Sequence, residues 1–191
     1  MRKEIIVIDG FYKDPNQIRR QALEMTYSVS GNYPGIRTKA LPGGDVREFL
    51  EGVMGIKIDK TKWNAGEYTG AYQYVAEGAN TWIHSDRHND WSCIVYLSPD
   101  PIDDSGTSFY KHKETGSISY HDTELGKEIE KDGNNTDAWV KTDVVANRFN
   151  RAVLFRGDLW HKADNYFGND LKSGRLFQTF FFSEENPNKT K

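Results

Sequence analysis

TWIHSDRHNDWSCIVYLSPDP, residues 81–101, joins a polar His-Ser-Asp segment to a strongly apolar run. The run Trp91–Ser98 is short, rich in β-branched and aromatic residues and followed by Pro and Asp, which predicts a buried strand. His84 and Asp86 are separated by one residue, so in an extended chain their side chains point to the same side. An imidazole and a carboxylate on one side can supply two ligands of a metal site, and the rest of the chain must supply the third.

Segments of similar composition recur over most of the remaining sequence. They are short and separated by Gly, Asn, Asp and Pro, which is typical of an antiparallel β-sandwich or barrel and not of a parallel α/β sheet. The expected strands are residues 57–66, 68–78, 80–86, 91–98, 106–113, 151–158 and 173–183. The fold class is therefore expected to be mainly β.

The N-terminal part of the chain adds α/β elements. Residues 4–9, EIIVID, predict a buried strand. Residues 14–28 predict a helix, because Asp14 is placed to cap it and Pro15 stands in its first turn. Residues 45–55 predict a second helix, and the stretch between the two helices is rich in turn-forming residues.

One domain is expected over residues 1–191, because this length supports one substantial core and is short for two. Residues 1–60 should wrap a β core formed by residues 61–183. Within the core, residues 112–142 are strongly polar, which predicts a surface insertion with a short helix at 122–131. The lack of apolar periodicity there predicts a mobile flap over the substrate.

Composition bears on partners and location. The formal net charge is −3 and the sequence has no dense Lys/Arg run, which argues against nucleic acid or an anionic membrane as the main partner. No apolar run approaches the roughly 18 residues of a membrane helix, and the N-terminal apolar run is shorter than the roughly 7–15 residues of a signal peptide. We expect a soluble, cytoplasmic protein. The single cysteine, Cys93, excludes an internal disulfide and should be a small buried hydrophobe.

The candidates for the third metal ligand are the histidines of the chain: His84, His88, His112, His121 and His161. The two in the polar insertion have no acid at ligand spacing, and His88 has left the predicted strand for a loop. His161 follows the strand predicted at residues 151–158, and a β-sandwich readily brings distant strands side by side. His84, Asp86 and His161 therefore form a candidate set of two histidines and one carboxylate.

This ligand set does not identify the metal. It suits the non-haem Fe(II) oxygenases, in which it occupies one face of an octahedral ion, and it also suits a catalytic zinc. A structural zinc site needs four protein ligands, usually with thiolates, and the single cysteine excludes it. Arg175 bears on the choice, because a cation between apolar residues of a strand needs an anionic partner if it points inward. The alternative is an arginine at a strand end that faces water.

The chain has a His-x-Asp motif, then a distant histidine, then a basic residue. This order of motifs resembles that of the Fe(II)/2-oxoglutarate-dependent oxygenase superfamily. Further stretches are similar to its prolyl-hydroxylase-like branch and to the opening of its small stand-alone bacterial and phage members. These stretches are YQYVAEGANTWIHSD (72–86), DDSGTSFY (103–110), NRAVLFRGDLWH (150–161) and IIVIDGFYKDPNQIRRQAL (5–23). The resemblance covers most of the chain and is weakest at residues 30–65 and 112–142.

The resemblance implies a double-stranded β-helix, or jelly roll, with Fe(II) held by His84, Asp86 and His161. It implies 2-oxoglutarate as cosubstrate, with its far carboxylate paired to Arg175. Such enzymes use O2 to hydroxylate an unactivated C–H bond and release succinate and CO2, and ascorbate is a helpful reductant. The substrate would be a peptide or a small molecule, and the protein a monomer or a homodimer.

One departure from the family concerns the 2-oxoglutarate carboxylate. The family often has Ser or Thr two residues after the arginine, whereas this chain has Phe177. Thr179 is one strand repeat further on. Tyr72 and Tyr74 share a strand face and are the other candidates for this hydrogen bond, with core packing as their alternative role.

Two rival functions use the same three metal ligands. One is a cupin-like metal-binding protein or dioxygenase that does not use 2-oxoglutarate, although a cupin typically has His-x-His where this chain has His-Ser-Asp. The other is a zinc hydrolase. Arg175 discriminates between the oxygenase and both rivals, because only the oxygenase needs a cation for the cosubstrate.

Overall fold

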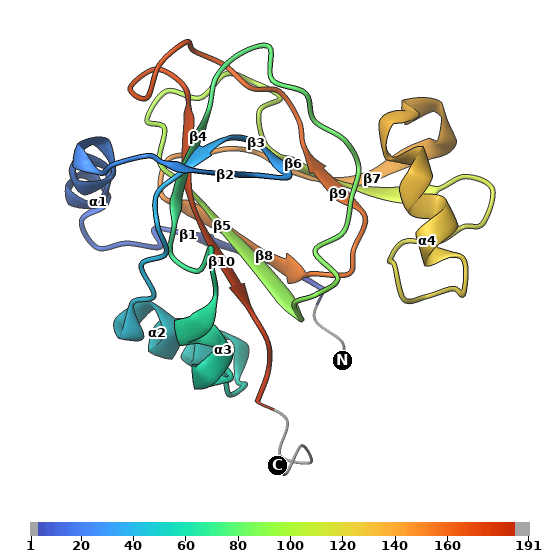
Figure 1. Cartoon of the computed structure of the whole chain (residues 1–191), viewed down its shortest axis with the longest axis horizontal. Helices are drawn as coiled ribbons and strands as arrows, with labels where there is room; N and C mark the ends of the chain where they lie inside the picture. Colours follow the sequence, from blue (N-terminus) through green and yellow to red (C-terminus); the bar gives the residue numbers. More distant parts are fainter. Residues whose placement is uncertain (1–3, 186–191) are drawn as a thin grey trace.

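Two antiparallel sheets form the framework of the structure, a computed structural model that describes residues 4–185 (Figure 1). The larger sheet has seven strands in the order β1-β8-β5-β10-β4-β3-β2, and the smaller has three in the order β7-β6-β9. The strands of the larger sheet are β1 (Ile5–Asp9), β8 (Arg151–Arg156), β5 (Trp91–Tyr96), β10 (Arg175–Phe182), β4 (Tyr72–Val75), β3 (Tyr33–Arg37) and β2 (Val29–Gly31). Those of the smaller sheet are β7 (Trp139–Val145), β6 (Thr107–His112) and β9 (His161–Ala163).

Strand β10, in the middle of the larger sheet, shows how the sequence creates two different layers. Successive side chains of a strand point to opposite faces. Leu176, Phe180 and Phe182 point to one face and belong to the main hydrophobic core. The alternate residues, beginning with Arg175, point to the other face and line a cavity.

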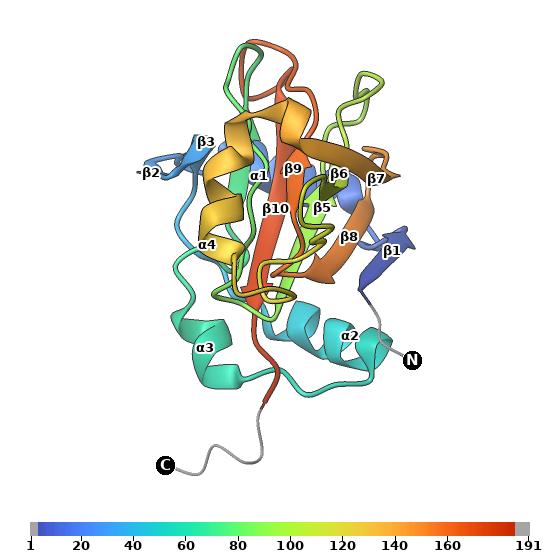
Figure 2. The ribbon, with the colours of Figure 1, turned by 90° about the vertical axis from the view of Figure 1, so that its right-hand side faces the viewer.

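Three helices cover the hydrophobic face of the larger sheet: α1 (Pro15–Glu24), α2 (Gly44–Met54) and α3 (Lys60–Ala65). Figure 2 shows α1 behind this sheet and α4 (Gly126–Ile129) in front of it. Trp63 of α3 stacks on Phe180, with ring centroids 5.6 Å apart and planes 8° apart. Cys93 is buried in the same core, as expected. None of the helices within residues 4–185 has the length and apolar character needed to cross a membrane.

The N-terminal predictions are largely confirmed. Strand β1 lies at the expected position, and the carboxylate of Asp14 accepts a hydrogen bond of 2.9 Å from the backbone N–H of Gln17 at the start of α1. Helix α1 ends at Glu24, earlier than expected. Helix α2 ends at Met54 and is capped by Gly55, whose φ of 70° is the left-handed conformation that favours glycine.

Two segments differ from their expected secondary structure. Residues 57–66 were expected to form a strand, but most of them form α3. The side chain of Asp59 accepts hydrogen bonds from the backbone N–H groups of Thr61 and Lys62, and this cap begins the helix. Strands β2 and β3 lie in and beside the region expected to be an irregular loop, and β3 pairs with β4.

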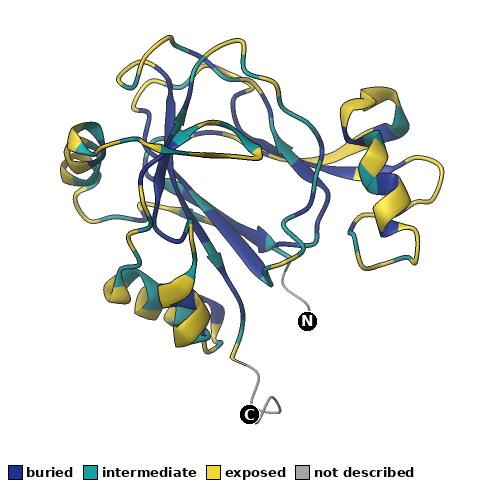
Figure 3. Cartoon of the chain, viewed as in Figure 1, coloured by how far each residue is buried: buried dark blue, intermediate teal, exposed yellow. Residues whose placement is uncertain are grey.

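The polar insertion is a folded part of the structure and contributes buried side chains to a core, although its composition was expected to be too polar for one; its movement over the substrate stays a prediction. It contains α4, two short 3₁₀ helices (Glu130–Asn134 and Thr136–Ala138) and the start of β7. Ile129 and Trp139 are buried in a separate cluster with Ile83 and Trp160. Figure 3 shows buried segments, drawn dark blue, among the exposed helices of the insertion. A Cβ atom on Gly133 would lie 2.4 Å from the carbonyl oxygen of Ile83, so glycine permits the close approach of the two backbones. The insertion therefore packs directly beside the His-x-Asp segment.

Candidate metal centre

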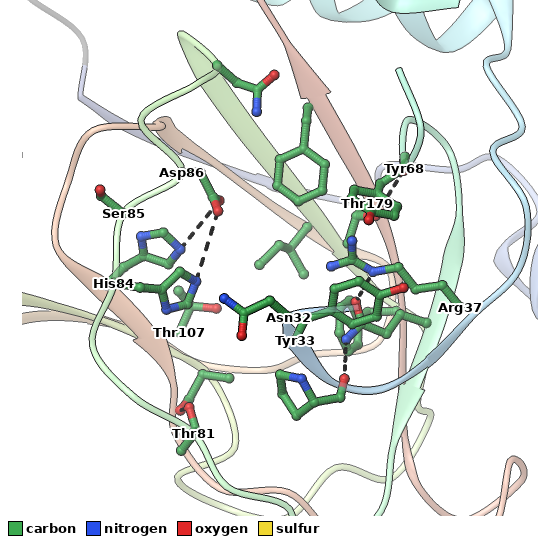
Figure 4. Close-up of a pocket in the computed structure, with 18 of the residues that line it drawn as sticks. Asn32, Tyr33, Arg37, Tyr68, Thr81, His84, Ser85, Asp86, Thr107 and Thr179 are labelled. Carbon is green, nitrogen blue, oxygen red and sulfur yellow. Dashed lines mark hydrogen bonds and ion pairs between the residues drawn. The ribbon is translucent and has the colours of Figure 1, made fainter. Parts of the chain in front are cut away.

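His84, Asp86 and His161 converge on one point, as the sequence predicts. Their ligand atoms all lie within 4.8 Å of one another. The Nε2 atom of His161 is 3.5 Å from Oδ2 of Asp86, and the Nε2 atom of His84 is 4.0 Å from Oδ1. This is the only group of three or more potential metal-binding side chains among residues 4–185. Figure 4 shows His84 and Asp86 at one side of the cavity.

A backbone bridge brings the two histidines together. The backbone N–H of each histidine donates a 2.9 Å hydrogen bond to the carbonyl oxygen of the other. Residues 80–86 were expected to form a strand, but only this isolated antiparallel bridge forms. Asp86 lies in the turn that follows, so the chain places both side chains on one side without a continuous strand.

The rings of both histidines are oriented by backbone carbonyls. Nδ1 of His84 lies 3.0 Å from the carbonyl oxygen of Trp82, and Nδ1 of His161 lies 2.9 Å from that of Leu159. A carbonyl oxygen only accepts hydrogen bonds, so in the neutral rings the proton is on Nδ1. The Nε2 lone pairs are then free for a metal, an arrangement typical of metal-binding histidines.

Burial sets the protonation of His161. Removal from water, with a smaller contribution from His84, lowers the pKa of His161 to about 4, although Asp86 acts in the opposite direction. The imidazole is therefore neutral at physiological pH, which is the form that binds metals.

The carboxylate of Asp86 is held by its own neighbours. The hydroxyl of Ser92, on β5, donates a 2.7 Å hydrogen bond to Oδ2 of Asp86. A Cβ atom on Gly157 would lie 2.8 Å from the carbonyl oxygen of Asp86 and 2.4 Å from that of Asn89. The turn after β8 therefore packs closely against the turn that carries the carboxylate, and this contact requires glycine.

The three side chains open into a cavity of about 440 Å³ between the two sheets. Ile94, Phe177 and Phe181 contribute apolar parts of its wall. Two arginines, Arg175 and Arg37, also line it. A mostly apolar cavity with a few polar groups is typical of a small-molecule site, and its volume lies within the usual range of roughly 300–1,000 Å³.

Arg175 points inward, as one of the two sequence-based alternatives predicts, and its side chain is 1% exposed. Its Nε donates to the carbonyl oxygen of Ser105 at 2.9 Å, and Nη2 donates to that of Gly106 at 3.2 Å. The rings of Tyr96 and Tyr166 lie 5.5 and 5.6 Å from its Cζ. No carboxylate within residues 4–185 forms an ion pair with this guanidinium.

The structure corrects the expected partners of Arg175. Tyr74 pairs with Leu176 and Tyr72 with Gln178, whereas Arg175 pairs with Val75. Paired residues of an antiparallel sheet share a face, so both tyrosines point to the helical layer, where they pack in or against the main core. Thr179 does line the cavity, but it lies four residues from Arg175, roughly 13 Å along the strand.

Other hydroxyl groups lie near Arg175 instead. Tyr96 and Tyr166 adjoin it, and the hydroxyls of Tyr96 and Thr107 lie 2.7 Å apart. Burial raises the pKa of both tyrosines, although Arg175 lowers it, so both hydroxyls remain protonated and able to donate. Sequence reasoning missed these residues. For Tyr96 a signal existed, because it alternates with Ser92 and Ile94 on the cavity face of β5.

The remaining histidines are not part of the triad. His112 is buried, and its Nε2 lies 3.2 Å from Oδ2 of Asp132, so it has a structural partner within the insertion. His121 is exposed. His88 lines the cavity and lies close to the metal ligands in sequence.

Solved structures with a similar fold include HygX and a prolyl-4-hydroxylase. HygX from Streptomyces hygroscopicus, with nickel and 2-oxoglutarate bound, is 14% identical, with a TM-score of 0.57 over 94% of this chain and 82% of that chain. A prolyl-4-hydroxylase from Pseudomonas putida is 13% identical, with a TM-score of 0.52 over 96% of this chain and 94% of that chain. At these identities the likeness concerns the fold alone.

No curated protein matches the chain. The profile described as "Family of unknown function (DUF6445)" matches residues 1–182, which is nearly the whole sequence. The chain therefore belongs to the DUF6445 family.

Proposed function

We propose that the protein is a non-haem Fe(II)/2-oxoglutarate-dependent dioxygenase that hydroxylates an unactivated C–H bond of a small molecule or peptide. The observation that carries the proposal is a cavity that holds both a three-ligand metal set and a buried arginine without an acidic partner. A metal-binding protein without a keto acid cosubstrate has no need of the second feature.

The donor set fits ferrous iron. His84, Asp86 and His161 would hold the ion through two Nε2 atoms and one carboxylate oxygen, and the cavity lies on their open side. The iron would supply oxidation of a C–H bond by O2, coupled to decarboxylation of 2-oxoglutarate to succinate and CO2. The protein's part is to hold the ligands, orient the substrate and exclude water.

Arg175 would bind the far carboxylate of 2-oxoglutarate, assisted by the hydroxyls of Tyr96 and Tyr166. A buried cation is costly unless it is paired, and its two carbonyl partners leave the charge uncompensated. The formal charges of Fe(II), Asp86, 2-oxoglutarate and Arg175 sum to zero, which suits a buried site.

The fold supports this proposal. HygX and the prolyl-4-hydroxylase share the architecture, and the HygX structure contains nickel and 2-oxoglutarate. We infer that the two antiparallel sheets are the halves of a double-stranded β-helix, with the metal between them.

The decisive experiment is a titration that requires no knowledge of the substrate. Anaerobic Fe(II) protein should develop a weak visible charge-transfer absorption on addition of 2-oxoglutarate, as the keto acid chelates iron. In Arg175→Ala, the protein should still bind iron but require far more 2-oxoglutarate. Loss of one partner of a buried charge pair costs about 2–5 kcal/mol, which corresponds to a roughly 30- to 4,000-fold weaker affinity.

Arg20→Ala is a suitable control, because it removes an exposed arginine from α1, on the other side of the larger sheet. It should leave the titration unchanged. Equal affinities in the parent and in Arg175→Ala would assign the carboxylate to another residue. Absence of the absorption in iron-loaded parent protein would favour the cupin-like rival, and hydrolysis with zinc alone would favour the zinc hydrolase.

A further inference from the structure

The cavity contains a second buried cation, Arg37, that the proposed chemistry at the metal does not use. Arg37 ends β3, and its side chain is 7% exposed. Its pKa is lowered to about 10, chiefly by burial, so the guanidinium remains charged at neutral pH. Figure 4 shows it pointing into the cavity from the side opposite His84 and Asp86.

The surroundings fix the plane of the Arg37 guanidinium. Its Cζ lies 3.7 Å from the ring centroid of Tyr33 and 4.5 Å from that of Tyr68. Its Nε donates a 2.6 Å hydrogen bond to Oε1 of Gln73, whose amide nitrogen donates to the carbonyl oxygen of Pro34 at 2.6 Å. Two aromatic rings and the hydrogen bond from Nε therefore fix the orientation of the Arg37 guanidinium.

The outer edge of this guanidinium is free. No residue among 4–185 accepts a hydrogen bond from Nη1 or Nη2 of Arg37, and none of them pairs with it through a carboxylate. Glu67 and Lys62 lie at the same cavity, but both are exposed and their charges are opposite. Two free nitrogens on a rigid planar group match the two oxygens of a carboxylate.

The charges of the cavity lead to the same conclusion. Iron, Asp86, 2-oxoglutarate and Arg175 already cancel, so the +1 charge of Arg37 is left over. Buried charges in proteins are normally paired. A ligand with one negative group would restore neutrality.

We propose that Arg37 is a substrate-binding residue, and that the substrate is a small molecule with a carboxylate that Arg37 binds through Nη1 and Nη2. This inference rests on the proposed function, because the charge count includes the cosubstrate. The carboxylate would sit against Tyr33 and Tyr68, and Ile94, Phe177 and Phe181 would contact the apolar part of the molecule. A cavity of about 440 Å³ that must also hold 2-oxoglutarate favours a small molecule over a peptide.

The test uses protein saturated with Ni(II), which cannot turn over, and with 2-oxoglutarate. The probes are acetate and benzoate, each compared with its neutral amide, acetamide or benzamide, at constant ionic strength. At ten times its Kd, a carboxylate should raise Tm by about 3–6 °C in a chain of this size. The amides should produce no shift, and Arg37→Gln should lose the response to carboxylates.

Lys62→Gln is the matched control, because it removes an exposed cation at the same cavity and should keep the response. If Arg37→Gln does not fold, Gln73→Glu tests the same point by giving Arg37 an internal counter-charge. Equal shifts from carboxylates and amides, no shift from either carboxylate, or an undiminished shift in the Arg37 variant would each overturn the inference.

The 2-oxoglutarate titration separates this inference from the proposed function. Arg37→Gln should leave the affinity for 2-oxoglutarate within about two-fold of the parent, whereas Arg175→Ala should weaken it strongly. A large loss in Arg37→Gln would make Arg37 the cosubstrate anchor and overturn its assignment to the substrate. If the parent binds 2-oxoglutarate normally but no carboxylate, the inference fails and the proposed function stands.

Discussion

The two faces of the larger sheet are built from the same strands but differ in polarity, because only one of them carries charged side chains around a cavity. The face toward α1, α2 and α3 is a close-packed apolar core, in which Phe180 stacks on Trp63. The opposite face carries charged and hydroxyl side chains around a cavity, with Arg175 and Asp86 at different points of its wall. Because side chains alternate along a strand, one strand can supply core residues to one face and cavity residues to the other. Substitutions on the two faces should therefore have separable effects.

The largest effect is expected at the metal. His161→Ala removes one of the three proposed ligands, so metal-dependent succinate formation should fall to background while the protein remains folded, as far-ultraviolet circular dichroism would show. His121→Ala, an exposed histidine of the insertion, is the control and should behave like the parent. Full activity in His161→Ala would remove this ligand from the proposed site and direct attention to His88.

A large effect on stability is expected on the other face. Phe180 is fully buried, and truncation of a buried Phe to Ala typically lowers the free energy of unfolding by about 3–5 kcal/mol. Phe180→Ala should cost this amount, measured by denaturant unfolding, yet keep its affinity for metal and 2-oxoglutarate. Phe177→Ala, three residues away on the cavity face, should cost less stability and weaken 2-oxoglutarate binding, because Phe177 contacts Arg175. Identical profiles for the two variants would contradict the separation of the faces.

A smaller effect is expected from the hydroxyl that orients Asp86. Ser92→Ala removes its 2.7 Å hydrogen bond to Oδ2, and loss of such supporting partners typically weakens metal binding about 10- to 100-fold. Competition with a chelator of known affinity measures this change. Ser98→Ala is the matched control, because the Ser98 hydroxyl is buried but donates to the carbonyl oxygen of Gly174. Equal metal affinities in all three proteins would mean that Asp86 needs no such support.

The smallest effect compares two buried tyrosines, one on each face. Tyr96→Phe removes a hydroxyl beside Arg175, and a hydrogen bond contributes about 1 kcal/mol, so 2-oxoglutarate should bind about five-fold more weakly. Tyr72→Phe alters the helical face and should leave this affinity unchanged. The reverse result would restore the assignment based on sequence alone.

The parts of the fold that were predictable depend on local patterns. The strand at β5 is a compact apolar run, and α1 begins at an aspartate followed by proline, so both could be located without the structure. Helix α3 was missed because aromatic and β-branched residues near Trp63 suggest a strand, although the capping residue Asp59 was a usable signal.

In the site, some residues were predictable from the sequence and others were not. The metal triad was predictable because the spacing of His84 and Asp86 is itself the signal. The partners of Arg175 were not predictable, because they depend on which face of β4 it meets. That face is set by the pairing of Arg175 with Val75, a register that no local pattern specifies. Arg37 was missed because it lies in a turn-rich segment expected to be a loop, whose short strand β3 joins the larger sheet by pairing with the distant strand β4.

The reciprocal backbone hydrogen bonds between His84 and His161 have a consequence for the kinetics of metal loading. The two imidazoles are joined through peptide groups at short range, so bringing them together does not require a loop to close when the ion arrives. The entropy of assembling the site is lost during folding instead. Protein stripped by a chelator should therefore keep its far-ultraviolet circular dichroism and take up metal again in a single fast phase, without the delay of a refolding step.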